Sequence, residues 1–340
     1  VNCAPEAFQQ KMEDILRDCE DVITYIDDLL IFANDLESLQ QKTEMVLEAL
    51  KRNNLTLNES KCEYARTELE FLGHKLTAEG FQISEKKVED VRKFRSPRNA
   101  SELKSFLGLV TFLNAYVEKF ADLTSPLWSA AKAKEFRWSD ELEDCFARVK
   151  DEIIDSTIKQ GFFKEGDKTI LYTDASPVAL GAVLIQEDEE GKRRIISFAS
   201  KLLSPTESRY PQVHKEALAV VWAAEHFWFY LLGRKFTIRT DAQGVMFILQ
   251  RDRSHSSRIM SRAAAYALKL SQFDCEIEFV QGKSNIADPS SRLVEGVGDD
   301  YVDKEAPGEI FAISQDKIED VSIGEGCITF EELKWHTMQD

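Results

Sequence analysis

The sequence has no run of about 20 apolar residues and no basic segment leading into an apolar one near Val1, so we expect neither a membrane span nor secretion. Its cysteines include no C-x-x-C pair, which favours free buried thiols in a reducing compartment over disulfides or a zinc site. The six cysteines are Cys3, Cys19, Cys62, Cys145, Cys275 and Cys327. What remains is an ordinary globular composition, 43% hydrophobic and 30% charged over 340 residues, sufficient for two or three domains.

The sequence has fewer basic than acidic residues, 43 Lys and Arg against 60 Asp and Glu, and its net charge is −17. Such an excess of acid argues against a protein that grips nucleic acid, but the distribution is uneven. Residues 294–340 hold 13 acidic residues and 3 lysines, a local charge of −10 that leaves −7 for the rest. The segment GVGDDYVDKEAPGE in this tail is polar and poor in periodic apolar residues, which predicts a flexible linker.

Four acidic residues in the second half of the chain stand where the local patterns would aim their carboxylates at one point. Asp174 ends an apolar, strand-like run in TILYTDAS, and Asp241 ends another in KFTIRTDAQ. Glu216 lies in the helical run HKEALAVVWAAEHF, and Asp288 lies in NIADPSSR. Taken alone, each acid is more simply a turn, cap or solvent-facing residue. Together they offer the clustered oxygen ligands that two Mg²⁺ ions require, as in a two-metal nuclease.

Local patterns also predict the elements around these acids. Short runs rich in β-branched and apolar residues, separated by Gly181 and a polar stretch at 187–192, predict three antiparallel strands. Apolar residues at helical spacing between Thr206 and Gly233 predict a helix with Glu216 near its start. The aromatic residues of this region should pack in the core, because they carry large buried areas. They are Trp222, Phe227, Trp228, Phe229 and Tyr230.

Residues 165–293 contain, in order, the motifs YTDAS, ALGAVLIQ, ISFASKLL, KEALAVVWA, RTDAQ and GKSNIADPSSR. In these motifs the segment resembles the ribonuclease H domain of reverse transcriptases from gypsy-type LTR retrotransposons. The resemblance implies that Asp174, Glu216, Asp241 and Asp288 bind two Mg²⁺ ions, for which Mn²⁺ can substitute, and cleave RNA in RNA:DNA hybrids. The loop FVQGKSNIAD departs from the family because it lacks the usual His before the fourth acid. The spacing of the nearest histidines, His214, His226 and His255, marks none of them as a replacement, so the role of the missing His stays unassigned.

A second acidic signal lies in VITYIDDLLIFAND, where Asp27 and Asp28 separate two apolar runs. The runs predict a hairpin with both carboxylates at its turn, and adjacent acids are ordinarily turn formers. The YIDD sequence with its apolar flanks nevertheless resembles the polymerase hairpin of reverse transcriptases. That resemblance implies that Asp27 holds metal for RNA-directed DNA polymerisation and that Asp28 has a lesser catalytic role. The neighbouring NCAPEAFQQKMEDIL and FLGHKLTAEGFQIS resemble the helix before this hairpin and the hairpin that grips the primer.

The segment KFRSPRNASELKSFLGLVTFLNAYVEKFADLTSPL resembles the connecting region of the same enzymes, and EFRWSDELEDCFARVK resembles the helix that leads into their ribonuclease H domain. Apolar spacing from Leu103 to Phe120 predicts a helix packed on its neighbours. Residues 111–116 read TFLNAY where aromatic and basic residues are more usual. This departure weakens the case for basic nucleic-acid contacts there.

Ten basic residues of the ribonuclease H region are candidates for phosphate contacts, although solvated surface explains them equally well. They are Lys192, Arg193, Arg194, Lys201, Arg209, Lys235, Arg251, Arg253, Arg258 and Arg262.

The sequence starts just before the AP-x-x-F segment and lacks the earlier palm aspartate that the resemblance implies. We therefore expect a fragment of a Pol polyprotein, with protease, fingers and palm upstream and an integrase downstream. A polymerase site without half of its ligands cannot hold metal and triphosphate together, so little polymerisation is expected from this chain alone.

The predicted fold combines α+β and α/β parts. A partial palm occupies residues 1–82, a helical thumb or connection 83–160, a ribonuclease H-like mixed β-sheet domain with flanking helices 161–293, and an acidic linker 294–340. The expected function is cleavage of RNA in RNA:DNA hybrids beside an incomplete polymerase site. Hybrid, primer-template and the rest of Pol are the expected partners, in the cytoplasm and in virus-like particles. The alternative is an inactive or domesticated remnant that binds nucleic acid or protein, but the four intact acids favour the enzyme.

Overall fold

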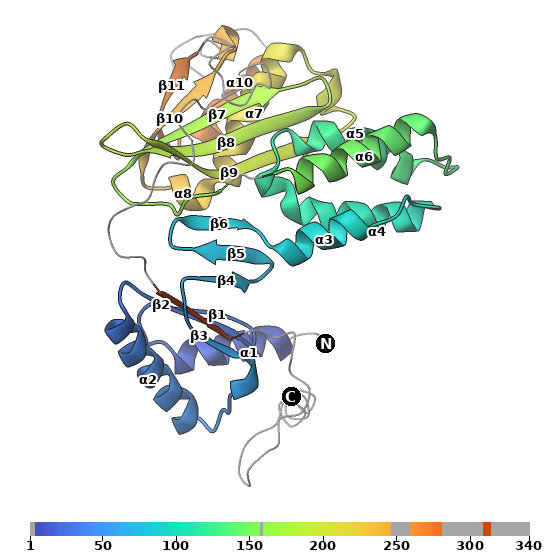
Figure 1. Cartoon of the computed structure of the whole chain (residues 1–340). Helices are drawn as coiled ribbons and strands as arrows, with labels where there is room; N and C mark the ends of the chain where they lie inside the picture. Colours follow the sequence, from blue (N-terminus) through green and yellow to red (C-terminus); the bar gives the residue numbers. More distant parts are fainter. Residues whose placement is uncertain (1–3, 157–158, 246–258, 281–308, 314–340) are drawn as a thin grey trace. The chain divides into compact units, whose positions relative to one another are not determined.

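The computed structural model describes residues 4–156, 159–245, 259–280 and 309–313 (Figure 1). The chain forms two compact units, and each is considered by itself. Unit 1 comprises residues 1–79 and 301–340, and unit 2 comprises residues 80–300. Among the described helices, none combines the length and the apolar character needed to cross a membrane.

Unit 1 is built on a four-stranded sheet with the order β1-β2-β12-β3. Its helices are α1 (Ala4–Ile15) and α2 (Leu36–Arg52), and its strands are β1 (Val22–Tyr25), β2 (Asp28–Ala33), β3 (Cys62–Arg66), β4 (Glu68–Phe71), β5 (His74–Thr77) and β12 (Glu309–Ile313), with a 3-10 turn η1 (Glu59–Lys61). The predicted hairpin is present, since β1 and β2 pair antiparallel. The strands β4 and β5 form a second antiparallel hairpin.

The helix α2 shows why this unit folds as it does. Asp35 caps its start by accepting a hydrogen bond from the Ser38 backbone N–H, which satisfies one of the free donors of the first turn. Leu39, Val46 and Leu50 lie on one face of the helix and are buried with apolar residues of α1 and β2. Spacing of seven and four residues thus places one stripe of α2 in the core.

The strand β12 differs from the expectation of a linker over residues 294–340. It pairs antiparallel with both β2 and β3 and lies between them in the sheet. Strand pairing between segments so far apart in sequence leaves no local signature beyond a short apolar run. Within residues 294–340, the structure describes only residues 309–313.

Unit 2 begins with the strand β6 (Gly80–Ile83) and a group of helices with their own core. The helices are α3 (Glu85–Lys93), α4 (Ala100–Thr111), the 3-10 helix η2 (Phe112–Tyr116), α5 (Phe120–Lys132) and α6 (Asp140–Ile154). The single helix expected from Leu103 to Phe120 is wrong, because the chain leaves the helical conformation at Val117 and adopts a left-handed conformation at Lys119. The apolar spacing conceals the break, since residues on both sides are buried in the same core.

The rest of unit 2 is a five-stranded mixed sheet with the order β11-β10-β7-β8-β9. Its elements are β7 (Lys168–Ala175), β8 (Ala179–Glu187), β9 (Arg193–Leu202), η3 (Glu207–Arg209), α7 (Gln212–His226), α8 (Trp228–Leu231), β10 (Lys235–Thr240), α10 (Ile259–Leu270) and β11 (Asp274–Phe279). The three predicted antiparallel strands are confirmed as β7, β8 and β9. The strand β10 runs parallel to β7, so the carboxyl ends of these two strands meet at one edge of the sheet.

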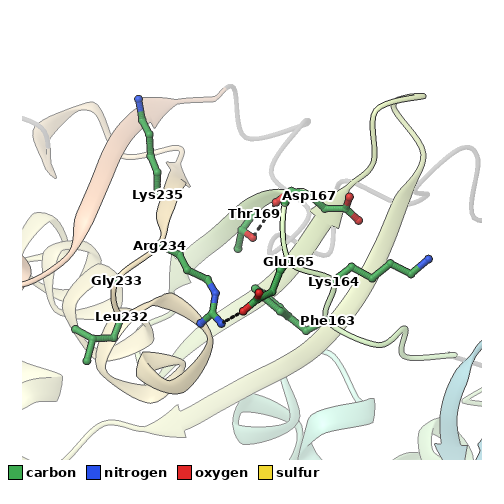
Figure 2. A pocket seen from close by; sticks show the side chains of 10 residues that line it. Phe163, Lys164, Glu165, Asp167, Thr169, Leu232, Gly233, Arg234 and Lys235 are labelled. Carbon is green, nitrogen blue, oxygen red and sulfur yellow. Dashed lines mark hydrogen bonds and ion pairs between the residues drawn. The ribbon is translucent and has the colours of Figure 1, made fainter. Parts of the chain in front are cut away.

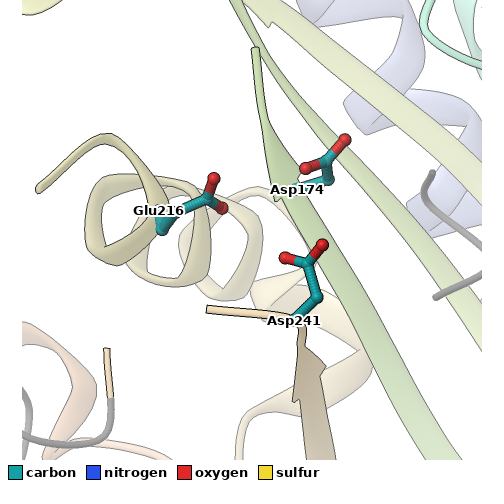
Figure 3. A group of neighbouring side chains, drawn as sticks. All are labelled: Asp174, Glu216 and Asp241. Carbon is teal, nitrogen blue, oxygen red and sulfur yellow. The ribbon is translucent and has the colours of Figure 1, made fainter. Parts of the chain in front are cut away.

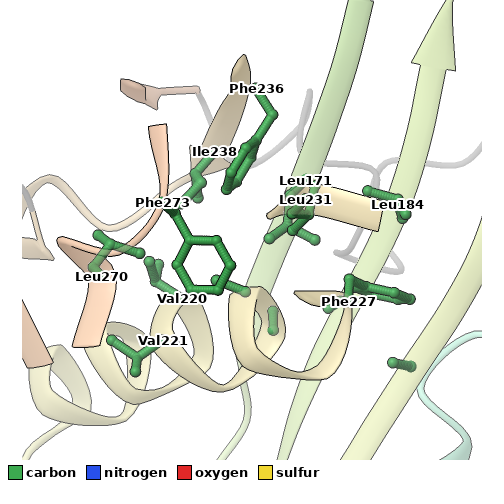
Figure 4. Packing of buried hydrophobic residues seen from close by; sticks show 14 of the residues in the cluster. Leu171, Leu184, Val220, Val221, Phe227, Leu231, Phe236, Ile238, Leu270 and Phe273 are labelled. Carbon is green, nitrogen blue, oxygen red and sulfur yellow. The ribbon is translucent and has the colours of Figure 1, made fainter. Parts of the chain in front are cut away.

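The helix α7 covers one face of this sheet (Figure 4). Val220 and Val221 of α7 join Leu171 and Ile238 of the sheet in one core, to which α10 contributes Leu270. The sheet and α7 are thereby fixed relative to each other, which fixes the side chains at the sheet edge.

The aromatic cluster of residues 222–230 divides into two groups. Phe227 is buried, and Trp222 and Tyr230 pack against the core, as predicted. The prediction is wrong for Trp228 and Phe229, which are 54% and 74% exposed. The helical periodicity gave no sign that α7 ends at His226 and that the short helix α8 turns these two rings outward.

Candidate functional site

Asp174 lies near the carboxyl end of β7, one residue before the strand ends at Ala175. The residues around it are buried, and its own side chain is only 16% exposed. The β7–β10 register pairs Arg239 with Tyr172. Continued by two residues, this register places Asp241, which directly follows β10, opposite Asp174. Two strand ends therefore present two carboxylates side by side.

Glu216 approaches the same edge from the helix α7. It lies one turn into the helix and is 6% exposed, so its carboxyl group is held inside the unit. The Nε2 of Gln212 donates to Glu216 Oε1 at 2.6 Å and to the carbonyl of Ala175. This side chain fastens the start of α7 to the end of β7. The other carboxyl oxygen of Glu216, Oε2, is buried and has no hydrogen-bond partner.

The carboxylates of Asp174, Glu216 and Asp241 converge on one point, as Figure 3 shows. One oxygen from each lies within 4.8 Å of the others; these three residues are called the acidic cluster below. Burial, together with the charges of Asp174 and Asp241, raises the pKa of Glu216 to about 8, although its hydrogen bond from Gln212 acts in the opposite direction. A buried carboxyl oxygen without a partner beside two other carboxylates is costly unless a cation binds there. The donor set, all oxygen and all acidic, fits Mg²⁺ or Mn²⁺.

A cationic side chain already contacts the acidic cluster. Lys119, between η2 and α5, places its Nζ 2.5 Å from Asp174 Oδ2. Close by, Asp122 accepts a hydrogen bond from the Ser176 hydroxyl, and burial raises the pKa of this carboxyl group despite that bond and the charge of Lys119. Sequence reasoning missed Lys119, because nothing in the local pattern brings together residues separated by 55 positions.

The remaining predicted site residues lie elsewhere. Asp288 is outside the described residues, so the structure places three of the four predicted ribonuclease H acids. Asp27 and Asp28 belong to unit 1 and are a separate pair. Whether any of these residues is catalytic stays a prediction at this point.

Asp27 and Asp28 do not both lie at the turn tip, contrary to expectation. Tyr25 pairs with Asp28 across the hairpin, which leaves Ile26 and Asp27 as the turn and makes Asp28 the first residue of β2. Ile26 adopts a φ of 54°, an unfavourable left-handed conformation for a β-branched residue. Gln9 of α1 stabilises it, accepting a hydrogen bond from the Ile26 N–H at 2.5 Å and donating to the Thr24 carbonyl. Asp28 is 6% exposed, and one oxygen of Asp27 is buried without a hydrogen-bond partner.

The candidate basic residues mostly have partners inside the protein. Arg193, Arg194, Lys201 and Lys235 form ion pairs with Glu187, Asp167, Glu207 and Glu276. Arg262 lies over the Tyr210 ring at 3.8 Å. Arg251, Arg253 and Arg258 are outside the described residues. The paired residues are consistent with the alternative of ordinary solvated surface.

A pocket of about 560 Å³ lies at the opposite end of the sheet, lined by the segments that lead into β7 and β10 (Figure 2). Arg234 lines the pocket. A guanidinium nitrogen of Arg234 lies 2.7 Å from Glu165 Oε1, and the guanidinium lies over the Phe163 ring. The strands enter the sheet here and leave it at the acidic cluster. The pocket therefore has no part in the chemistry of the cluster.

Two protein families match the sequence. Residues 164–273 match the family described as "RNase H-like domain found in reverse transcriptase", and residues 1–76 match "Reverse transcriptase (RNA-dependent DNA polymerase)". The first match includes the whole acidic cluster, and the second includes the Asp27–Asp28 hairpin.

Curated relatives have the same character. The chain is 33% identical over 297 residues to the Retrovirus-related Pol polyprotein from transposon 297 of Drosophila melanogaster, covering 85% of this chain and 27% of that protein. It is 30% identical over 301 residues to the Transposon Tf2-3 polyprotein of Schizosaccharomyces pombe, covering 87% of this chain and 22% of that protein. The chain thus spans about a quarter of the length of these relatives.

Solved structures agree on the fold. The foamy viral protease-reverse transcriptase in complex with an RNA/DNA hybrid matches with a TM-score of 0.70 and 18% identity, over 88% of this chain and 40% of that one. A second foamy viral structure, with double-stranded DNA, matches with a TM-score of 0.71 and 18% identity, over 81% and 49%. At this identity the likeness concerns the fold alone.

Fold and sequence together define a protein with a reverse transcriptase domain and a ribonuclease H-like domain. The chain belongs to the reverse transcriptase and ribonuclease H region of retrotransposon Pol polyproteins, and the predicted kinship with LTR retrotransposons is confirmed. Domains of this kind point to an enzyme.

Proposed function

We propose that unit 2 hydrolyses the RNA strand of RNA:DNA hybrids at the acidic cluster. The observation that carries the proposal is the convergence of three carboxylates within 4.8 Å, one of them with a buried oxygen that has no hydrogen-bond partner. The three carboxylates repel one another when they are charged, and a bound divalent cation reduces this repulsion. The RNA/DNA hybrid in complex with the foamy viral protease-reverse transcriptase, a structural neighbour, supports the choice of substrate.

The residues of the cluster have distinct parts in this proposal. Asp174 and Asp241 would hold cations at the sheet edge, and Glu216 would give up its proton to do the same from α7. Asp288, known from the sequence motif, would complete the set. Two bound Mg²⁺ ions, or Mn²⁺ in their place, would supply activation of the attacking water and stabilisation of the leaving 3′ oxygen. Because specificity for a hybrid comes from 2′-hydroxyl and backbone contacts, cleavage should be nearly independent of sequence.

The proposal predicts that residues 1–340 cut the RNA strand of a labelled hybrid when Mg²⁺ or Mn²⁺ is present. Asp174→Asn should lower the rate by more than about a hundredfold, because bound metal contributes several kcal/mol of transition-state stabilisation. The substitution removes a ligand charge and little packing, so circular dichroism should stay unchanged. Gel analysis of a 5′-labelled RNA strand measures the rate.

Asp274→Asn is the matched control, since Asp274 is exposed and begins β11, a strand whose register pairs it with Lys235 at the far end of β10. This variant should cleave like the wild type. A folded wild type that binds the hybrid and leaves it uncut with both metals would favour the alternative, a remnant that only binds nucleic acid.

For unit 1 we propose that Asp27 and Asp28 serve RNA-directed DNA polymerisation within a longer Pol polyprotein, with primer-template as substrate. The match to the reverse transcriptase family over residues 1–76 supports this assignment. Within the described residues, one group of three or more side chains could hold a metal ion, and it is the acidic cluster of unit 2. Asp27 and Asp28 are not part of such a group there. We expect the hairpin to need further ligands, because two adjacent carboxylates are too few to hold two metal ions and a triphosphate.

A further inference from the structure

Lys119 lies outside the matched ribonuclease H-like region, yet it contacts the acidic cluster. Its ammonium group is 2.5 Å from Asp174 Oδ2, and the two side chains are only 19% and 16% exposed. An ion pair shielded to this degree is screened much less by salt than a surface pair. The contact joins the helical connection to a predicted metal ligand within unit 2.

The backbone of Lys119 is held in a conformation that a lysine adopts only when its surroundings require it. Its φ of 48° and ψ of 33° are left-handed, which is unfavourable for a residue with a Cβ atom. The carbonyl of Lys119 accepts the first helical hydrogen bond of α5, from the Leu123 N–H at 3.1 Å. The turn therefore both starts the helix and directs the lysine side chain toward β7.

Hydrogen bonds on both sides of the turn fasten it to the sheet. The Ala121 N–H donates to the Ser200 hydroxyl at 2.8 Å, and that hydroxyl donates to Asn114 Oδ1 at 2.8 Å. Asn114 returns a hydrogen bond to the Ser200 carbonyl at 3.3 Å. The Ser176 hydroxyl, just after β7, donates to Asp122. Lys119 is thus placed by a polar network that spans η2, α5, β9 and the end of β7.

The chemistry of the contact is a competition for one carboxylate. An ammonium group and a divalent cation are both attracted by the negative charge of Asp174, and their positive charges repel each other at short range. In the protein without metal, the ammonium group neutralises part of the acidic cluster. When a metal ion binds Asp174, its charge weakens the attraction between this carboxylate and the lysine.

We propose that Lys119 is a positioning residue for the metal site, which holds Asp174 through its ammonium group when metal is absent and competes with metal for that carboxylate. The connection thereby sets the metal affinity of a site whose ligands all lie outside it. This inference rests on the proposed function, because it requires that metal bind at Asp174.

The test is metal binding by the full chain of 340 residues, measured by calorimetric titration with Mn²⁺ and with Ca²⁺ at one pH and ionic strength. Lys119→Met keeps most of the length of the side chain and removes the charge. It should bind Mn²⁺ at least about fivefold more tightly than the wild type, the lower end of typical coupling between linked sites. Its melting temperature without metal should fall, because Asp174 loses its counter-ion. Lys119→Arg keeps the charge and should bind close to the wild type.

Lys132→Met is the matched control. Lys132 is the last residue of α5, the helix that follows Lys119, and it is exposed and lies over the Trp128 ring. Its replacement by methionine changes the net charge by the same amount as Lys119→Met. This variant should bind Mn²⁺ like the wild type. Lys119→Gln repeats the test if the Met variant does not fold by circular dichroism.

The outcomes separate this inference from the proposed function. Saturable Mn²⁺ binding that Asp174→Asn abolishes, with equal affinities in Lys119→Met and Lys132→Met, would overturn the role of Lys119 alone. A lower melting temperature in Lys119→Met without a change in affinity would show a purely structural lysine and would overturn it too. Absence of any binding sensitive to Asp174→Asn would overturn the proposed function, and this inference with it.

Discussion

Glu216 is subject to opposing requirements, because the fold buries a carboxyl group that metal binding needs in its charged form. Burial and the charges of Asp174 and Asp241 raise its pKa from 4.5 to about 8. The folded state therefore binds this proton more tightly than the unfolded state does. The stability that follows is complete below about pH 4.5 and is lost as the pH rises to about 8. Metal should reverse the loss, since it binds the folded, deprotonated site.

These signs give a prediction for the protein without metal. Its free energy of unfolding should fall through Glu216 between about pH 5 and about pH 8, and Glu216→Gln, which cannot ionise, should lack this component. Urea unfolding in EDTA across that range measures both. Adding Mg²⁺ at about pH 8 should stabilise the wild type more than the variant. Identical pH slopes for the two proteins would show that burial does not control this carboxyl group.

At the residue scale, the acids were predictable and their neighbours were not. Asp174, Glu216 and Asp241 stand in motifs whose strand and helix patterns already imply convergence, and the structure brings them together. Lys119 stands in a segment whose pattern predicted a plain packed helix. Its contact depends on a left-handed backbone and on hydrogen bonds to Ser200 and Ser176, and none of these can be read from apolar spacing.

At the element scale, the end of α8 determines how the chain enters β10. Gly233 follows the helix with a φ of 75°, and a Cβ atom added there would meet nothing within 4 Å. Only the backbone conformation therefore opposes a larger residue. Gly233→Ala should destabilise unit 2 by about 1–2 kcal/mol, the cost of a left-handed conformation for a residue with a Cβ atom.

Gly108 supplies the matched control, because it is an exposed residue inside α4 with equally open surroundings and no left-handed backbone. Gly108→Ala should stabilise the same unit by about 0.5–1 kcal/mol, since alanine restricts the unfolded chain and favours the helix. The two substitutions are chemically identical and should change the midpoint of urea unfolding in opposite directions. Equal shifts would contradict the assigned conformation of Gly233.

Elements were predictable where the signal is local. Runs of β-branched and apolar residues and the polar stretch at 187–192 identified β7 to β9, although Gly181, expected to separate two strands, lies inside β8 and pairs with Asp174. The turn between two apolar runs identified the hairpin of β1 and β2. The breaks after η2 and after α7 were not predictable, because buried residues continue at helical spacing across both. The position of β12 between β2 and β3 could not be predicted for another reason. The local sequence of a strand does not indicate which distant strands it will pair with.

At the scale of the whole molecule, the residues of the two proposed sites lie in two separate units. The acidic cluster lies within unit 2, and the Asp27–Asp28 hairpin lies within unit 1. The chain spans about a quarter of its curated relatives. We expect residues 1–340 to cut hybrids and to leave a primer unextended, because two adjacent hairpin carboxylates are fewer than the ligands that two metal ions and a triphosphate require.

This division predicts opposite effects of two matching substitutions in a longer Pol polypeptide that includes the upstream sequence. Asp27→Asn should abolish primer extension on an RNA template and leave hybrid cleavage near the wild-type rate, because it changes only the hairpin carboxylate proposed to hold metal. Asp174→Asn should abolish cleavage and spare extension. Both activities are measured on one labelled primer-template, with Asp274→Asn as the control that should preserve both. Primer extension by residues 1–340 alone would show that the hairpin needs no further ligand, and full extension by the Asp27→Asn polypeptide would remove Asp27 from the polymerase site.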